Sequence, residues 1–213
     1  LLESPSSAFQ NDINHRVFSS LKHRFSNAYV QLKSAYYNEK NIYTDSVRSV
    51  FGNNPCKTFI NQFDFSKSIN NFNILKINLT NSLASANGNN YLDIAEINRT
   101  SITGSFKVNN PKYRLKHLLT TSLLFDKKYL SPFTFSYSLK REFHNHFNLY
   151  FNAGKVYRFP TINDLFWNPG GNLNLVPEQG YTGDIGIIWT KKIHKVIFSF
   201  EPSLYSRWID NWI

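Results

Sequence analysis

Apolar and polar residues alternate along most of the chain, and a period of two predicts β-strands whose two faces differ. Between Phe133 and Phe143, aromatic and aliphatic side chains occupy most odd positions, while Thr, Ser, Lys and Glu occupy the even ones. The same alternation predicts further strands near residues 17–25, 28–36, 59–69, 72–84, 102–108, 113–125, 147–157, 181–190 and 196–204. The pattern therefore indicates about ten strands of roughly ten residues, the length of a tilted strand that crosses a bilayer.

The connections between these strands alternate in length. Short turns are expected at Ser26, Asn70, Asn109, His144 and Lys191. Longer connections are expected to start at Asn38, Ser85, Asp126 and Arg158, and part of the polar stretch 38–57 is expected to extend its strands as a hairpin beyond the membrane. A transmembrane barrel has short periplasmic turns on one rim and long loops on the other, although a soluble meander can reach this order by accident.

The predicted fold class is all-β, an antiparallel up-and-down transmembrane β-barrel. Every backbone N–H and C=O must be paired inside hydrocarbon, so strands cross a bilayer only as a closed sheet. A polar strand face suits a wet lumen, and it suits the solvent-exposed face of a soluble sheet equally well. Aromatic residues near several strand ends fit interfacial girdles, and they also fit the ordinary β-propensity of aromatic side chains.

Composition supports a membrane barrel more than an ordinary soluble domain. Aromatic residues make up 16% and charged residues only 18% of the chain, against roughly 25% charged in a typical soluble domain. No apolar run approaches the roughly 20 residues of a membrane-spanning helix. The net charge is +10, but the basic residues are scattered among the strands, so we expect no nucleic-acid partner. A composition rich in Lys, Asn and Ile throughout explains the charge, and attraction to anionic lipid headgroups or to an anionic ligand is the alternative.

The chain shows no pattern of catalytic residues, and we expect it not to be an enzyme and to hold no cofactor or metal. His144 and His146 flank one residue, but no Cys or acidic residue lies close by in sequence, so a polar turn is preferred over a metal site. The single cysteine, Cys56, excludes an internal disulfide. The chain contains no Met and starts without a signal sequence, so we expect it to be a piece of a longer protein.

The stretch from Tyr157 to Glu178 is unusual for a loop. It combines Pro, Gly and Asn, which form turns, with Phe and Trp, which a solvated loop normally lacks. Pro160 is expected to end one strand, residues 168–171 to form a turn, and residues 177–178 to lead into the next strand. The candidate ligand-binding residues are Asn163, Asp164, Phe166, Trp167 and Asn168, and scaffolding of the loop is the favoured alternative role for them.

This stretch resembles the signature loop of TonB-dependent outer-membrane receptors, in particular their cobalamin- and siderophore-receptor branch. The residues that carry the resemblance are Arg158-Phe159-Pro160-Thr161, Asn163-Asp164-Leu165-Phe166-Trp167, Gly170-Gly171-Asn172, Leu175, Pro177-Glu178 and, further on, Tyr205 to Ile213. The chain departs from the family at Leu173, where many members have Pro, and at Val176, where a basic residue is frequent. These departures bear on the ligand more than on the fold.

The resemblance implies a 22-stranded barrel around an N-terminal plug, of which residues 1–213 would be a single segment that is incomplete at both ends and lacks the plug. It implies a receptor, integral to the cell outer membrane, for energy-coupled uptake of a scarce ligand such as a siderophore or cobalamin. The implied partners are the TonB protein, acting through the plug, a small-molecule or metal-chelate ligand and outer-membrane lipid. The resemblance leaves undecided whether a surface lipoprotein, acting as a lid over the outer mouth, is a further partner.

Two alternatives remain at this point. One is a different outer-membrane β-barrel, a porin or export pore, in which the aromatic loop would form a constriction or lid. The other is a soluble β-rich glycan-binding module that uses Trp167 as a stacking platform.

Overall fold

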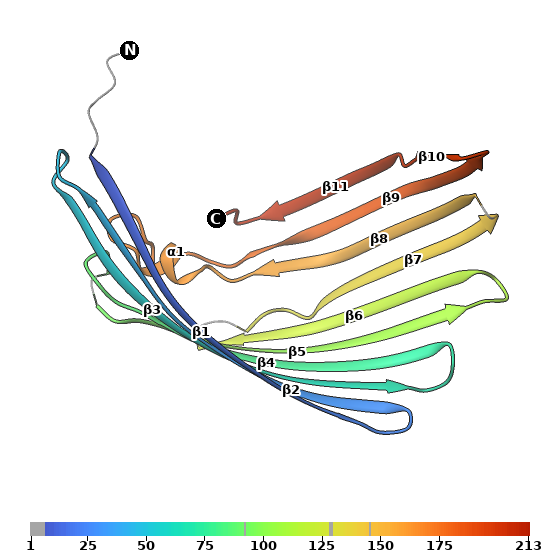
Figure 1. The fold of residues 1–213 in the computed structure, drawn as a ribbon, viewed down its shortest axis with the longest axis horizontal. Helices are drawn as coiled ribbons and strands as arrows, with labels where there is room; N and C mark the ends of the chain where they lie inside the picture. The colour runs from blue at the N-terminus through green and yellow to red at the C-terminus, as the bar shows by residue number, and fades with distance from the viewer. Residues whose placement is uncertain (1–6, 92, 128–129, 145) are drawn as a thin grey trace, which may run out of the picture.

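The computed structural model describes residues 7–91, 93–127, 130–144 and 146–213, which form one antiparallel sheet of 11 strands (Figure 1). The strands pair in chain order, except that the last two both pair with the ninth. The strands are β1 (Ala8–Arg24), β2 (Ala28–Asp45), β3 (Val50–Ser68), β4 (Asn73–Ala86), β5 (Ala95–Asn110), β6 (Leu115–Asp126), β7 (Thr134–His144), β8 (Phe147–Arg158), β9 (Glu178–Ile193), β10 (Val196–Phe200) and β11 (Ser203–Asp210). The short helix α1 (Ile162–Phe166) lies between β8 and β9. Among the described residues, no helix is long and apolar enough to cross a membrane.

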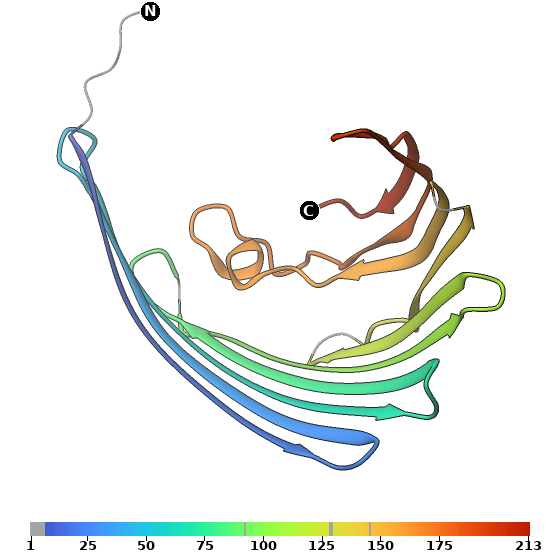
Figure 2. The same ribbon diagram turned by 45° about the vertical axis from the view of Figure 1, so that its right-hand side comes forward.

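The sheet is a single layer that curves into a trough, with β1 along one edge and β11 along the other (Figures 1 and 2). The loop that carries α1 lies over the concave side of this trough (Figure 2). Phe133 is 56% exposed and Phe135 is 40% exposed, so these outward side chains are not covered by a second sheet. The single layer differs from a β-sandwich, which needs two packed layers.

One row of directly paired residues shows that the outer face is apolar. It runs across six strands in the order Leu21, Leu32, Phe63, Leu79, Ile102 and Leu123. Leu32 is 51% exposed and Leu79 is 41% exposed, although both lie on strands that are paired on both sides. The large exposed apolar face fits contact with lipid or with another apolar surface.

The neighbouring row faces the concave side and is polar throughout. It runs across seven strands in the order Lys22, Gln31, Asp64, Asn78, Thr103, Ser122 and Thr134. Asp64 accepts a hydrogen bond from Asn78 at 2.7 Å and lies 2.9 Å from Lys33 Nζ. The alternation that the sequence predicted is therefore confirmed. The outer face of the sheet is apolar, and the inner face carries hydrogen-bonded polar side chains.

The two rims of the sheet differ as expected. Short connections at residues 25–27, 69–72, 111–114 and 194–195 all lie at the right-hand rim of Figure 1. The opposite rim carries the connections 46–49, 87–94 and 159–177. Residue 145, in the expected turn at His144, lies outside the described residues, as do residues 128 and 129 of the connector that begins at Asp126.

The stretch 38–57 is a paired hairpin, as expected for part of it, and only residues 46–49 form the connection itself. β2 and β3 run on to Asp45 and Val50 and are joined by a four-residue turn. The buried carboxylate of Asp45 closes this turn by accepting hydrogen bonds from the backbone N–H groups of Val47 and Arg48. β2 and β3 continue beyond the apolar row, where neither face of the sheet needs to be apolar, and this explains their polar composition here.

Three other boundaries also differ from the expectation. β1 begins at Ala8 instead of Val17, and the turn after β9 lies at His194–Lys195 instead of starting at Lys191. The last predicted strand is interrupted at Glu201–Pro202, since proline has no N–H to donate to the ladder. β10 and β11 nevertheless pair with β9 in one continuous register, with Phe200 opposite Trp189 and Ser203 opposite Gly186.

Candidate functional site

The signature stretch folds into a capped turn of helix. Thr161 precedes α1, and its hydroxyl oxygen accepts a hydrogen bond from the backbone N–H of Asp164 at 3.2 Å. In return the Asp164 carboxylate accepts the backbone N–H of Thr161 at 2.7 Å. This reciprocal capping box satisfies two backbone donors at the helix start and explains why so short a helix forms here. After α1, Gly170 adopts a φ of 120°, which favours glycine, in the expected turn of residues 168–171.

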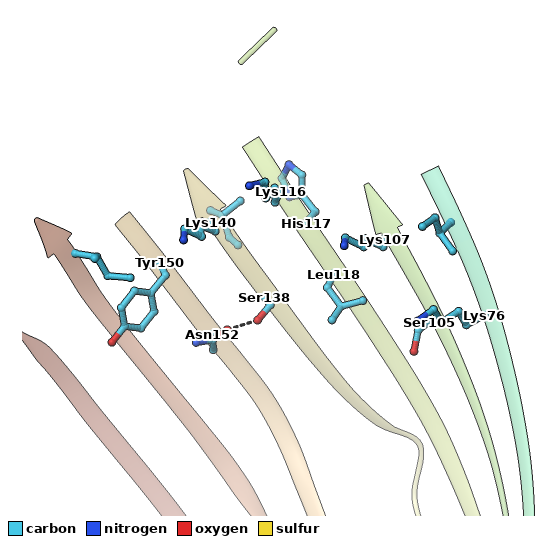
Figure 3. Close-up of a pocket in the computed structure, with 13 residues that line it drawn as sticks. Lys76, Ser105, Lys107, Lys116, His117, Leu118, Ser138, Lys140, Tyr150 and Asn152 are labelled. Atoms are coloured by element: carbon cyan, nitrogen blue, oxygen red, sulfur yellow. Dashed lines mark hydrogen bonds between the residues drawn. The ribbon is translucent and has the colours of Figure 1, made fainter. Parts of the chain in front are cut away.

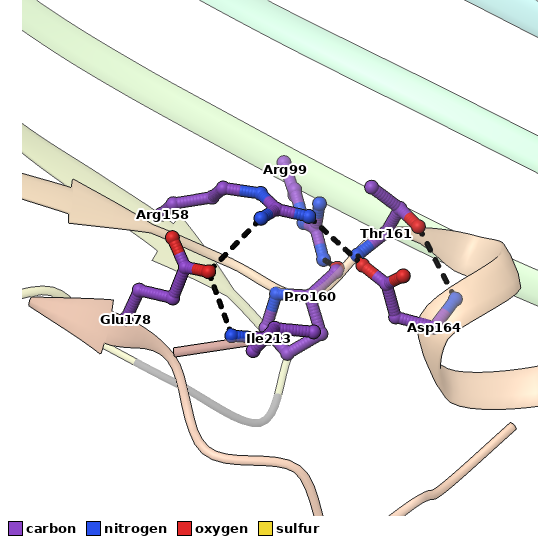
Figure 4. Close-up of polar contacts among 7 residues, drawn as sticks. All are labelled: Arg99, Arg158, Pro160, Thr161, Asp164, Glu178 and Ile213. Carbon is purple, nitrogen blue, oxygen red and sulfur yellow. Dashed lines mark hydrogen bonds and ion pairs between the residues drawn. The ribbon is translucent and has the colours of Figure 1, made fainter. Parts of the chain in front are cut away.

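Arg158 ties the two ends of the loop together. Its guanidinium lies 3.0 Å from Glu178, the first residue of β9, and 3.1 Å from Asp164 in α1 (Figure 4). Glu178 is only 5% exposed and also accepts the backbone N–H of Ile213 at 2.8 Å. The strand that ends before Pro160 and the strand that begins at Glu178 are thus joined by one charged network, as the expected boundaries require.

Arg99 on β5 attaches the loop to the wall of the trough. Its Nε donates to Asp126 at 2.8 Å, and its other end donates to the backbone carbonyl of Pro160. The guanidinium also lies 5.0 Å from the ring centre of the buried Phe159. These contacts fix the point at which the chain leaves β8 and turns into the concave side.

The loop also docks against the connection between β4 and β5. The Tyr91 hydroxyl donates to Asn163 Oδ1 at 2.6 Å, and the rings of Tyr91 and Trp167 meet edge to face at 5.5 Å. The backbone N–H of Asn168 donates to the carbonyl of Asn90 at 2.7 Å. Burial raises the pKa of Tyr91, as does the nearby Cys56, so the hydroxyl stays protonated as this donor.

A cavity of about 460 Å³, here called the loop cavity, lies between this docked loop and the inner wall. Its lining consists of Asp12, Asn14, Glu39, Lys40, Asn41, Asn54, Cys56, Tyr91, Ile162, Asn163 and Trp167. Its volume falls in the roughly 300–1,000 Å³ range of small-molecule sites. Amides, carboxylates and two aromatic rings converge there, so the cavity offers both hydrogen bonds and a stacking surface.

The five candidate residues separate into different environments. Asn163 and Trp167 line the loop cavity, while Phe166, Trp167 and Asn168 line a second hollow of about 520 Å³ on the same loop. The Asp164 carboxylate is engaged by the capping box and by Arg158. Contact of these residues with a ligand stays a prediction, and the scaffolding role accounts for the side-chain contacts of Asp164.

Sequence reasoning missed the opposite wall of the loop cavity. Asp12 and Asn41 face each other from β1 and β2, and Asn41 donates to Asp12 at 2.7 Å. Asn54 on β3 donates to Asn90 at 2.8 Å and so holds the second loop. The polar side chains of these strand ends were visible in the sequence, but their meeting depends on the register of three strands.

Across residues 7–91, 93–127, 130–144 and 146–213, no group of three or more His, Cys, Asp or Glu side chains could hold a metal ion. The side chain of His144 lies outside the described residues, so the pairing of His144 with His146 is not tested.

Acid is expected to loosen the docked loop. Burial alone would raise the pKa of Asp164, but hydrogen bonds from Thr161 and the charges of Arg158 and Arg99 outweigh it and hold the pKa below its ordinary value of 3.8. A pKa that is lower in the folded state contributes stability above pH 3.8, and this stability is lost as the pH falls through the lower folded value. Hydrogen exchange of the Thr161 amide should therefore be flat from pH 7 to about pH 4, after correction for intrinsic rates, and accelerate below it.

Asp164→Asn is the control for this expectation. It keeps the shape and an acceptor oxygen of the capping side chain but carries no charge and cannot be titrated. It should therefore weaken the protection of the Thr161 amide at neutral pH and remove the extra acceleration in acid. An acid profile identical in both proteins would contradict the role given to Asp164.

The fold and the site together define a class of protein. A one-layered antiparallel meander with an apolar convex face, a polar concave face and one rim of long loops is part of an up-and-down transmembrane-type β-barrel. Residues 116–213 match the family model described as TonB dependent receptor-like, beta-barrel. The C-terminal part of the chain, residues 116–213, thus matches the β-barrel of TonB-dependent receptors, and the resemblance carried by the signature loop in this part is confirmed.

Solved structures support the same fold. The siderophore receptor PirA from Pseudomonas aeruginosa aligns over 86% of this chain with a TM-score of 0.70 and 9% sequence identity. The alcaligin outer-membrane receptor FauA from Bordetella pertussis aligns over 96% of it with a TM-score of 0.65 and 12% identity. In both cases the match spans 38% of the other chain's length. No curated protein matches the sequence.

Proposed function

We propose that the full-length protein is an outer-membrane receptor that takes up a scarce ligand through a plugged barrel, with energy supplied by the TonB protein. The apolar row from Leu21 to Leu123 would face lipid, and the polar row from Lys22 to Thr134 would line the passage. In this scheme the barrel performs no chemistry. It supplies a rigid wall and a selective rim.

Residues 1–213 are proposed to be one segment of the barrel. The outer edges of β1 and β11 have no partner strand among the described residues. Unpaired strand edges cannot stay within hydrocarbon, so further strands must complete the wall in a membrane. A 22-stranded barrel of the family would need about as many strands again, and the plug would lie inside.

The loop cavity carries the proposal for ligand binding. It lies on the rim with the long loops, which is the extracellular rim in transmembrane barrels. Because two similar folds are described as siderophore and alcaligin receptors, a siderophore, cobalamin or similar chelate is the ligand class proposed here. Asn163 and Trp167 would contact this ligand, and a surface lipoprotein would be an additional lid over the same rim.

Replacing Trp167 by alanine is expected to weaken ligand binding about tenfold, since a stacked aromatic side chain in a cavity contributes roughly 1–2 kcal/mol. Equilibrium binding to cells that carry the protein measures the change. Trp208→Ala is the matched control, because Trp208 is 73% exposed on the outer face of β11 and does not line the loop cavity. Equal losses in both variants would show that the effect is not specific to the loop cavity.

Uptake measurements separate the receptor from a porin or export pore. Accumulation of a radiolabelled ferric siderophore or cobalamin should require the protein, the TonB protein and the proton gradient together. A porin would pass small solutes without TonB, and solute entry that persists in a TonB-deficient strain would overturn the proposal.

A further inference from the structure

Basic side chains form a belt on the outer face of the sheet, beside the rim of short turns. Lys67 on β3, Arg141 on β7 and Lys191 on β9 face outward, since each continues the alternation of the apolar face along its own strand. Lys112 and Lys195 lie in the turns that follow β5 and β9. All five residues are exposed, and together they are here called the outer basic belt.

The described residues place no carboxylate against this charge. Lys67 stands opposite Leu75, and Lys191 stands opposite Phe198. Among the described residues, no ion pair joins the belt to an acidic side chain. The four short connections described at this rim contain no Asp or Glu, whereas the long connections at the opposite rim contain one Arg and two Asp. Positive charge is therefore concentrated at the short-turn rim.

A carboxylate near this rim, that of Glu142 on β7, belongs to the concave side. Its Oε1 atom lies 2.8 Å from Nζ of Lys116. Lys116 lines a hollow of the concave wall together with Lys76, Lys107 and Lys140 (Figure 3). In a complete barrel this wall faces the interior, where a plug would cover it, so these lysines are not part of the outer basic belt.

Exposed aromatic rings accompany the belt. The guanidinium carbon of Arg141 lies 4.8 Å from the ring centre of Phe143, and Nζ of Lys112 lies 5.5 Å from that of Tyr113. Phe143 is 41% exposed and Tyr113 is 57% exposed. Aromatic rings and long basic side chains share the boundary between hydrocarbon and water, where the apolar parts stay in lipid and the charges reach the headgroups. Where the apolar face meets hydrocarbon, the belt lies at the depth of the headgroups.

We propose that the outer basic belt binds the phosphate groups of anionic phospholipids such as phosphatidylglycerol. The short-turn rim is the periplasmic rim of a transmembrane barrel, so the bound lipid belongs to the periplasmic leaflet. The basic residues are spread in a row from β3 to the turn after β9, beside the apolar face, and this arrangement suits a shell of lipid better than one folded acidic protein. The inference rests on the membrane location in the proposed function, but it requires no ligand in the loop cavity.

Tryptophan quenching by brominated lipid tests the proposal on the full-length protein in vesicles. Trp189 faces outward opposite Phe147, two residues before Lys191, and the signal that Trp189→Phe removes isolates it from the other tryptophans. Phosphatidylglycerol should be preferred over phosphatidylcholine beside Trp189, and the preference should fall as salt is raised. The double variant Arg141→Gln, Lys191→Gln should reduce it about fivefold or more, because each basic side chain near an anionic membrane strengthens the attraction about fivefold.

Lys140→Gln, Lys192→Gln is the matched control. Each of these lysines lies one residue from its counterpart on the same strand but faces the concave side, so the control loses the same charge from the other face. Its lipid preference should equal that of the wild type. Equal losses in the two double variants, or equal quenching of the wild type by the two lipids, would overturn the proposal.

Failure of this inference is distinguishable from failure of the proposed function. A wild type that inserts into vesicles and takes up its ligand without preferring phosphatidylglycerol would overturn the role of the belt alone. A protein that does not insert would overturn the membrane location on which both rest. Binding of polyglutamate by a wild type that shows no preference for phosphatidylglycerol would assign the belt to an acidic polypeptide instead.

Discussion

Replacing Leu79 by arginine is expected to lower the free energy of unfolding of the membrane-inserted protein by about 2–4 kcal/mol. Leu79 lies at the middle of β4 on the outer face, where its neighbours in the row are Phe63 and Ile102. A charged side chain at this depth would have to enter hydrocarbon or distort the bilayer around it. Urea titration of the protein refolded into vesicles measures the loss.

Thr80→Arg is the matched control, one residue further along the same strand. Thr80 faces the concave side, opposite Gln62 and Ser101, so an arginine there would enter the polar interior. Its effect should stay within about 1 kcal/mol. Similar losses for Leu79→Arg and Thr80→Arg would mean that the outer face does not meet lipid, and the receptor proposal would fail with it.

Replacing Arg99 by alanine is expected to release the signature loop from the wall. The substitution leaves Asp126, whose side chain is 12% exposed, without the guanidinium that lies 2.8 Å away, and it removes the donor to the Pro160 carbonyl. Breaking a fully buried pair costs about 3–5 kcal/mol, and partial exposure of Arg99 brings the expected cost of undocking to about 2 kcal/mol. Hydrogen exchange of amides 159–172 should accelerate by about 30-fold.

Arg16→Ala separates this effect from the simple loss of an arginine. Arg16 also pairs with a carboxylate, Glu39 at 2.7 Å, but its side chain is 62% exposed. Exposed pairs contribute roughly 0–1 kcal/mol, so the exchange of residues 159–172 should change by less than about fivefold. A loop that exchanges equally fast in both variants would show that Arg99 is not the anchor.

The strand pattern could be predicted from the sequence because the face on which a residue lies depends only on its position along its own strand. Alternation along β7 alone separates Phe135 and Leu139 from Ser136 and Ser138, and the structure places these sets on opposite faces. The strand prediction was less accurate where the strands extend beyond the part of the sheet that has an apolar outer face. For the polar residues of β2 and β3 beyond the apolar row, the sequence predicted a hairpin over only part of the stretch, since nothing local distinguishes a strand outside the bilayer from a loop.

The candidate site was less predictable than the strands. Asn163 and Trp167 were identified from the odd composition of their loop, and both line the loop cavity. Tyr91 could not have been assigned to the same place, because its contact with Asn163 joins segments that are 72 residues apart. The Asp164 carboxylate, chosen for its charge, proved to be engaged in capping α1.

By itself the sequence determined the all-β class, the two unlike faces, the alternation of short and long connections and the family of the signature loop. These features follow from periodicity, turn residues and short motifs, each of which acts over a few residues. Tertiary structure alone decided which strand ends meet at the loop cavity and which lysines share one hollow. Both depend on strand register, and a shift of one residue in a single pairing would turn those side chains to the opposite face.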